Sequence, residues 1–292
     1  MPGSASSICT RRSAGRGWSS RKSTPNCRWT HGDTAIEPTA IDVLVPAAAP
    51  PIELPTRPAG RIDRAIADHV ARLIPDRPTI ELGLGAIPQA VTRALGRKQG
   101  LGIHSGAIGD GIADLMEAGI VDNRHKEIDP AVTVATMLMG TSRLYRFADH
   151  NPAIQIRATS YTHDALVLGN FRRFIAINGA LEVDLTGQVN AETARGRHIG
   201  LVGGQMDFIR AANRAAQGRR TISGCPLDRR AITSIVMDGS SNDPEADRAD
   251  LARRAICCSD AADSDFSAVS AAEVHLSNLR YLDPQKCSYR RS

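Results

Sequence analysis

The sequence predicts an α/β fold, with a mainly parallel sheet and helices on both of its faces. Short apolar segments of strand length alternate with amphipathic segments of helical period along the middle of the chain. Glycine-rich turns join strands to helices within this region. The chain has 292 residues, of which 42% are hydrophobic, so it can bury a substantial core. Together these observations favour one large α/β domain.

The first unit of this fold is a helix, a strand, a glycine turn and a second helix. Isoleucine and valine recur at helical spacing over residues 61–74, which predicts an amphipathic helix. Residues 79–82 have the character of a short strand, and residues 83–87 contain two glycines. Pro88 suits the first position of the next helix, because that position needs no backbone N–H.

The alternation continues to about residue 216. We expect further strands at residues 101–104, 132–139, 154–158, 174–178 and 181–185. We expect a helix at residues 111–118, capped by Asp110, and another that begins after a cap at Thr141 or Ser142. A further helix is expected at residues 205–216.

Composition divides the chain into three zones. Residues 1–40 are rich in Ser, Arg and Gly without apolar periodicity, so we expect them to be disordered. Residues 41–222 form the predicted α/β domain. Residues 223–292 are dominated by small and charged side chains, and we expect a weakly structured tail.

Charge and cysteine placement exclude several function classes. Most of the net charge of +5 lies in the first 40 residues, so no basic stripe predicts a nucleic-acid partner. No apolar run reaches about 18 residues, so we expect no membrane span and a cytoplasmic protein. None of the six cysteines has the spacing of a zinc or redox site, so we expect no metal.

Two glycine pairs are candidate binding loops. Gly83-Leu84-Gly85-Ala86-Ile87 follows a strand and precedes a helix, so its backbone could approach a phosphate. Position 88 is proline, so the third glycine of a dinucleotide-binding loop is missing. Gly203-Gly204 precedes another helix and could present N–H groups to an oxyanion. Taken alone, a tight turn explains the first pair better than a binding loop does, and it explains the second pair equally well.

Carboxylates and a His–Ser pair are the other chemical candidates. Glu182 and Asp184 share one face of a predicted strand, where they suit acid–base work or simply a solvated face. Residues 186–188 fit a hairpin turn after them. His104 and Ser105 are adjacent in a strand, so they point to opposite faces and cannot form a nucleophile pair.

Several ordered stretches resemble the acetyl-CoA hydrolase/transferase family, which includes acetate and 4-hydroxybutyrate CoA-transferases. They are GLGAIPQAV, LGIHSGAIGDGIADLMEAGIV, ATMLMGTSRLYRF, DHNPAI, INGALEVDLTGQVNAE and VGGQMDFIRAA. The similarity runs from about Ile41 to Thr221. It implies a NagB/RpiA/CoA-transferase-like fold built from two halves, of which this chain resembles the C-terminal one. We expect the other half to be absent, as after a shifted or truncated reading frame, and the apolar face it would cover favours a homodimer.

The resemblance also implies substrates and site residues. The substrates are an acyl-CoA and a small carboxylate, with no permanently bound cofactor. The turn from Gly83 to Ile87 would contact the pyrophosphate or pantetheine arm of coenzyme A. Asn178 and the Gly203-Gly204 pair would line the thioester site.

The sequence departs from the family at its nucleophile. The family motif has a glutamate that attacks the acyl-CoA carbonyl, whereas this chain has Gly106 after His104-Ser105. Three explanations are open: water attacks directly, another carboxylate such as Glu182 or Glu192 replaces the glutamate, or the domain binds acyl-CoA without turning it over.

Overall fold

The computed structural model describes most of the region that the sequence predicts to be ordered. The described residues are 20–23, 27–33, 35–55, 58–180, 182–183, 189–191, 193–194, 197–198, 203–217, 219–224 and 234–238. The helices are α1 Arg61–Leu73, α2 Ala86–Ala94, α3 Asp110–Glu117, α4 Ser142–Ala148, α5 Thr159–Thr162, α6 Ala165–Leu168 and α7 Gln205–Arg214, with 3₁₀ turns η1 Pro38–Ala40 and η2 Leu95–Arg97.

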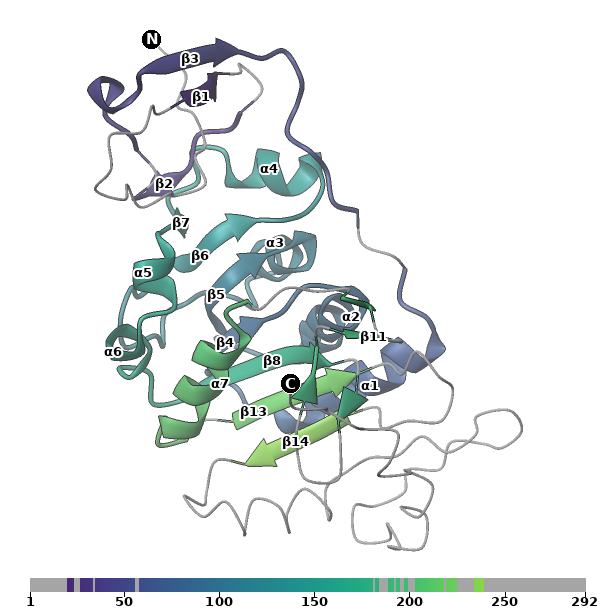
Figure 1. The fold of residues 1–292 in the computed structure, drawn as a ribbon. Coiled ribbons are helices and arrows are strands. Elements are labelled where there is room, and N and C mark those ends of the chain that lie inside the picture. Colours follow the sequence, from purple (N-terminus) through teal and green to yellow (C-terminus); the bar gives the residue numbers. More distant parts are fainter. Residues whose placement is uncertain are drawn as a thin grey trace, which may run out of the picture.

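One large sheet organises the molecule. Its strands are β2 His31–Gly32, β4 Thr79–Leu82, β5 Gly102–Ile108, β6 Thr133–Leu138, β7 Ile154–Ile156, β8 Phe174–Ala180, β13 Arg219–Gly224 and β14 Ser234–Asp238. The strand order is β14-β13-β8-β4-β5-β6-β7-β2 (Figure 1). Every neighbouring pair is parallel except β13 and β14, so the sheet is mainly parallel with one antiparallel edge.

Three smaller pairings complete the described strands. β1 Ser20–Ser23 pairs with β3 Val43–Pro46 in parallel. β9 Glu182–Val183 pairs with β10 Val189–Asn190, and β11 Thr193–Ala194 pairs with β12 Arg197–His198, both antiparallel.

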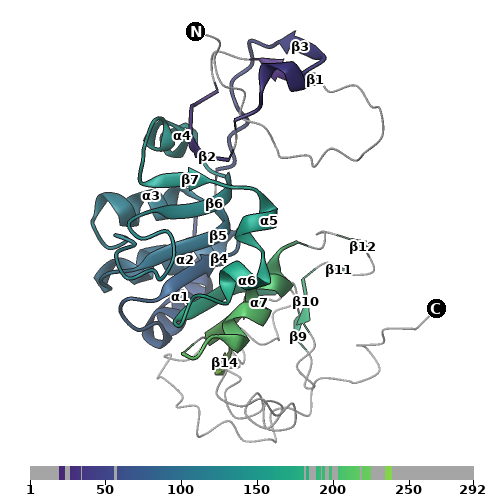
Figure 2. The same cartoon turned by 90° about the vertical axis from the view of Figure 1, so that its left-hand side faces the viewer.

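Helices cover both faces of the large sheet, and each face has its own apolar cluster. Helices α1, α2 and α3 lie on one face and α5, α6 and α7 on the other (Figure 2). Residues of α1–α3 pack with Ile80, Ile103 and Ile177 of the sheet. On the opposite face, Phe171, Phe174 and Phe208 form a smaller cluster around α7. Because side chains alternate along a strand, neighbouring residues of β4, β5 and β8 belong to different faces.

The predicted fold class is confirmed, and most elements lie within a few residues of the prediction. β4 coincides with the predicted strand, and Thr141 caps α4 by accepting a hydrogen bond from the N–H of Arg143 at 3.3 Å. Helix α2 begins at Ala86, so Pro88 lies in its third position rather than its first. Strand β5 extends to Ile108, beyond the predicted end at residue 104, because small residues 105–107 pair with β6 through their backbones.

The two terminal zones contain strands that the sequence pattern did not predict. β2 pairs with β7, and Trp29 beside it stacks on His150 at 5.1 Å. The expectation of disorder therefore does not hold for residues 27–33. β14 pairs with β13 beyond residue 222. β2 has only two residues, too few for a periodic pattern to reveal it, and the domain limits at residues 41 and 222 stay predictions. Among the described residues, no helix combines the length and apolar character that a bilayer crossing requires.

Candidate functional site

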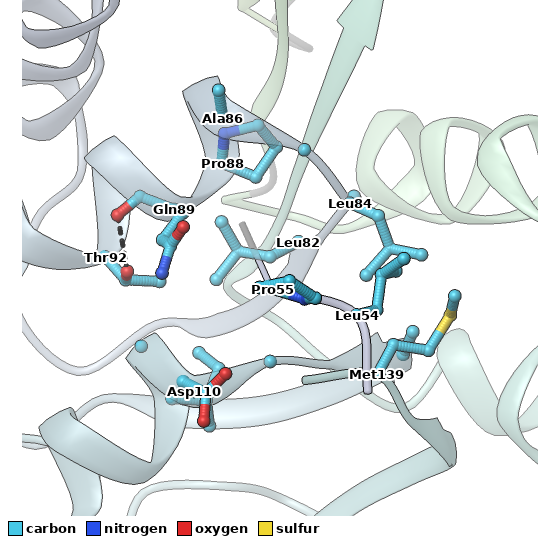
Figure 3. Close-up of a pocket in the computed structure, with 16 residues that line it drawn as sticks. Leu54, Pro55, Leu82, Leu84, Ala86, Pro88, Gln89, Thr92, Asp110 and Met139 are labelled. Atoms are coloured by element: carbon cyan, nitrogen blue, oxygen red, sulfur yellow. Dashed lines mark hydrogen bonds between the residues drawn. The ribbon is translucent and has the colours of Figure 1, made fainter. Parts of the chain in front are cut away.

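A cavity of 410 Å³ lies where β4 and β5 end and α2 and α3 begin (Figure 3). Its walls come from the glycine turn, the first turns of both helices, Met139 after β6, and the segment Leu54-Pro55. That segment is held in place because the N–H of Leu54 donates to the carbonyl of Gly140 at 2.9 Å. This is the edge of a parallel α/β sheet where ligands usually bind.

The glycine turn gives the cavity its shape. Gly85 has a φ of +125°, a conformation that side chains other than hydrogen disfavour, and it is the N-cap of α2. The N–H of Gly83 donates to the carbonyl of Ile177 at 2.8 Å. That N–H is therefore used within the sheet, so Gly83 shapes the turn instead of donating to a ligand. Leu84, between the two glycines, is half exposed and points along the cavity wall (Figure 3).

Asp110 is the ionisable residue in the lining of this cavity. It is the first residue of α3, and Gly109 is the N-cap, so the predicted capping role of Asp110 is wrong. Its carboxylate instead accepts hydrogen bonds from the N–H of Thr141 at 3.0 Å and from its hydroxyl at 2.7 Å. Asp110 thereby ties α3 to the start of α4. The rest of the lining is apolar or uncharged, which suits an uncharged ligand arm better than a phosphate.

A second group of site residues lies on the α7 face of the same strand ends. Glu81 in β4 is 3% exposed, and its Oε2 accepts a hydrogen bond from Nδ2 of Asn178 at 2.7 Å. A methyl group placed on Gly83 would lie 3.2 Å from Oδ1 of Asn178. The structure therefore brings two predicted residues, Gly83 and Asn178, into contact and adds a buried carboxyl group beside them.

Burial changes the charge of that carboxyl group. Desolvation raises the pKa of Glu81 to about 8, although the hydrogen bonds from Asn178 and from the backbone at Ile177 favour the charged form. Glu81 is therefore mostly protonated at pH 7.

Gly106 and Gly204 meet at a third residue, His163. A methyl group on Gly106 would lie 3.3 Å from Nε2 of His163, and one on Gly204 would overlap the same nitrogen. Both positions also face the ring of Phe208, whose centroid is 4.6 Å from that of His163. Only glycine at position 204 leaves room for this imidazole. Two of the predicted residues are thus joined by a histidine that the sequence did not single out.

The two histidines on this face are both neutral at pH 7. Burial lowers the pKa of His163, and Asp207 opposes that shift weakly. Burial and the nearby Lys126 lower the pKa of His104 to about 3. His104 donates from Nε2 to the carbonyl of Thr162 at 3.1 Å, whereas the Ser105 hydroxyl donates to the carbonyl of Leu82. The prediction that His104 and Ser105 serve opposite faces is confirmed.

The remaining predicted residues stay untested. Only the backbone of Glu182 is described, in β9, and Glu192 lies outside the described residues. Gly203 faces open space, since a methyl group added there would meet no atom within 4 Å. Sequence reasoning missed Glu81 and His163, and only Glu81 had a local signal, an acidic residue between Ile80 and Leu82 in an apolar strand. Among the described residues, no group of His, Cys, Asp and Glu could hold a metal ion.

Residues 140–242 match the family model of the acetyl-CoA hydrolase/transferase C-terminal domain. This match passes the limit at Thr221 that the sequence resemblance gave. The chain is 41% identical to the 4-hydroxybutyrate coenzyme A transferase of Clostridium kluyveri over 194 residues, which are 66% of this chain and 45% of that protein. It is 35% identical to the succinyl-CoA:cyclohexane-1-carboxylate CoA transferase of Geobacter metallireducens, over 68% of this chain and 46% of that protein.

Solved structures agree with the sequence matches. RipA from Yersinia pestis superposes with a TM-score of 0.66 at 32% identity, over 70% of this chain and 47% of RipA. The 4-hydroxybutyrate CoA-transferase from Porphyromonas gingivalis superposes with a TM-score of 0.61 at 29% identity, over 69% and 48% of the two chains. The chain thus spans less than half the length of these relatives. On the matched family model, the fold and these identities, the chain contains an acetyl-CoA hydrolase/transferase C-terminal domain.

Proposed function

We propose that this chain acts on short-chain acyl-CoA thioesters, either by transferring coenzyme A to a small carboxylate or by hydrolysing the thioester. The observation that carries the proposal is the cavity at the ends of β4 and β5, which adjoins the glycine turn of the family motif. Similar proteins are named as CoA-transferases, including two whose names give succinyl-CoA. An acyl-CoA supplies the uncharged, slender group that the cavity fits.

The lining decides which part of the acyl-CoA the cavity takes. A pyrophosphate would need cationic or N–H partners, and the charged side chain that lines the cavity is the carboxylate of Asp110. The pantetheine arm carries no charge, and apolar walls such as Leu54 and Leu82 favour it. We therefore assign the glycine turn to the pantetheine arm.

Binding is tested by calorimetric titration of the full chain with acetyl-CoA, and separately with ADP, which lacks the pantetheine arm. We expect saturable binding of acetyl-CoA and at least tenfold weaker binding of ADP. Ala86→Phe, which fills the cavity, should weaken acetyl-CoA binding, while Ala118→Phe on the exposed end of α3 should not. Equal binding of both ligands, or an unchanged Ala86→Phe variant, would contradict the assignment.

Binding without turnover is the second candidate function, because Gly106 cannot form the covalent anhydride that the family mechanism requires. Thiol release from acetyl-CoA distinguishes the two. Saturable release supports an enzyme, and binding with no release supports an acyl-CoA-binding domain.

A further inference from the structure

We infer that His163 takes over the chemistry at the Gly106 position, acting as the general base that activates water, so that this site hydrolyses acyl-CoA and does not transfer coenzyme A. The inference rests on the proposed function and names the acceptor that the proposal leaves open. It is carried by the position of the imidazole between Gly106 and Gly204.

The ring of His163 lies close to the position that a side chain at Gly106 would take. A side chain at this position would leave β5 on the α7 face, and its first carbon would be 3.3 Å from Nε2 and 3.4 Å from Cε1 of His163. The imidazole therefore lies where a glutamate side chain would have to pass. Position 106 thus has no side chain, and a nitrogen base lies close to where that side chain would be.

The second step is the orientation of the ring. Nδ1 of His163 shares a 2.8 Å hydrogen bond with the hydroxyl of Thr162, and that hydroxyl lies 3.4 Å from the carbonyl of Ala158. It also lies 2.5 Å from the hydroxyl of Thr136 in β6. A proton on Nδ1 can thus donate to Thr162, which donates onward, and this tautomer leaves Nε2 as an acceptor.

The third step concerns the lone pair of Nε2. His163 is only half-buried, and Nε2 receives no hydrogen bond from the described residues. The groups that face the ring are His104 from β5, Asp207 and Phe208 from α7, and Thr162 from α5. Burial lowers the pKa of His163, so the ring is in its basic form at neutral pH.

The fourth step is the charge that develops during attack. Gly204 is the N-cap of α7, a helix of ten residues, and a methyl group added to it would overlap the same imidazole nitrogen. The first N–H groups of a helix have no partners within it, and they can stabilise an oxyanion. The base and the start of α7 therefore lie next to each other.

The reaction balances without a further reactant. The oxygen of water forms a bond to the thioester carbonyl carbon while Nε2 of His163 accepts its proton. The C–S bond then breaks, and the leaving thiolate of coenzyme A takes the proton from His163. The products are the free acid and coenzyme A, and no covalent enzyme intermediate forms.

The test measures thiol release from acetyl-CoA by the full chain, with and without added acetate, and acetyl-CoA binding by calorimetry. For His163→Ala we expect unchanged binding and a loss of kcat of about 10²- to 10⁴-fold. Added imidazole should restore part of the rate. The wild-type rate should fall at acid pH with an inflection below 6.5, and acetate should not stimulate it. His150→Ala, on the exposed far edge of the sheet, is the matched control and should keep the wild-type rate.

The outcomes separate this inference from the proposed function. A wild-type chain that neither binds acetyl-CoA nor releases thiol overturns both. Thiol release that His163→Ala leaves unchanged overturns the inference alone. So does a covalent acyl or coenzyme A adduct on a glutamate, detected by mass spectrometry during turnover, because it would show nucleophilic catalysis.

Discussion

Replacing Glu81 with glutamine should stabilise the fold at neutral and alkaline pH. The carboxyl group is 3% exposed, and its pKa is raised from 4.5 to about 8 by burial. In the unfolded chain the same group ionises near pH 4.5. Between these two values the folded state holds a proton that the unfolded state has lost, so the stability of the wild type falls as pH rises.

The size of the effect follows from the shift. Each pKa unit corresponds to about 1.4 kcal/mol, so the protonation cost is about 1 kcal/mol at pH 5 and about 3 kcal/mol at pH 7. Glutamine is neutral at every pH and keeps a carbonyl oxygen for the 2.7 Å hydrogen bond from Asn178. The variant should therefore gain little at pH 5 and roughly 3 kcal/mol at pH 7, and more above pH 8.

Urea unfolding at pH 5, 7 and 8.5, followed by circular dichroism, measures this gain. Glu53→Gln is the control, because Glu53 is exposed and should change stability by less than about 0.5 kcal/mol at each pH. An equal or lower stability of Glu81→Gln at pH 8.5 would refute the reasoning, since it would mean that Glu81 is ionised in the folded chain without cost.

Three further predictions concern the framework of the site. Gly111→Ala would place a methyl group in overlap with the Thr92 hydroxyl between α2 and α3, so we expect a loss of about 1–3 kcal/mol in urea unfolding, whereas Gly96→Ala, which meets no atom within 4 Å, should be nearly neutral. Asp110→Asn should cost about 1–3 kcal/mol, because it weakens two hydrogen bonds to Thr141; thermal unfolding that shows no loss would mean that α3 and α4 are held by other contacts. Burial lowers the pKa of Lys126 to about 7, so the wild type should gain about 2–3 kcal/mol over Lys126→Met as pH rises from 6 to 9; a difference independent of pH would contradict this.

The sequence predicted the central fold well because its signals there are local. The periodic face of α1 and the strand-turn-helix unit around Gly83 depend on neighbouring residues, and both lie close to the prediction. Strand β2 could not be predicted, because its two residues form a strand only by pairing with the distant backbone of β7.

The candidate site was predicted in its parts but not in its arrangement. The glycine turn and Asn178 were identified from motifs, and the structure places Gly83 against Asn178. The contact between Gly106 and His163 depends on how α5 packs over β5, and no local pattern encodes that packing. Glu81 has a local signal, an acidic residue in an apolar strand, but this signal does not say whether the side chain faces solvent or the interior.

Thiol release from acetyl-CoA by the full chain, measured with and without acetate, shows whether this sheet edge is an acyl-CoA site. We expect saturable release that acetate does not stimulate and that His163→Ala abolishes while acetyl-CoA binding remains. A chain that neither binds acetyl-CoA nor releases thiol, at any pH from 6 to 9, would contradict the claim that this sheet edge is an acyl-CoA site.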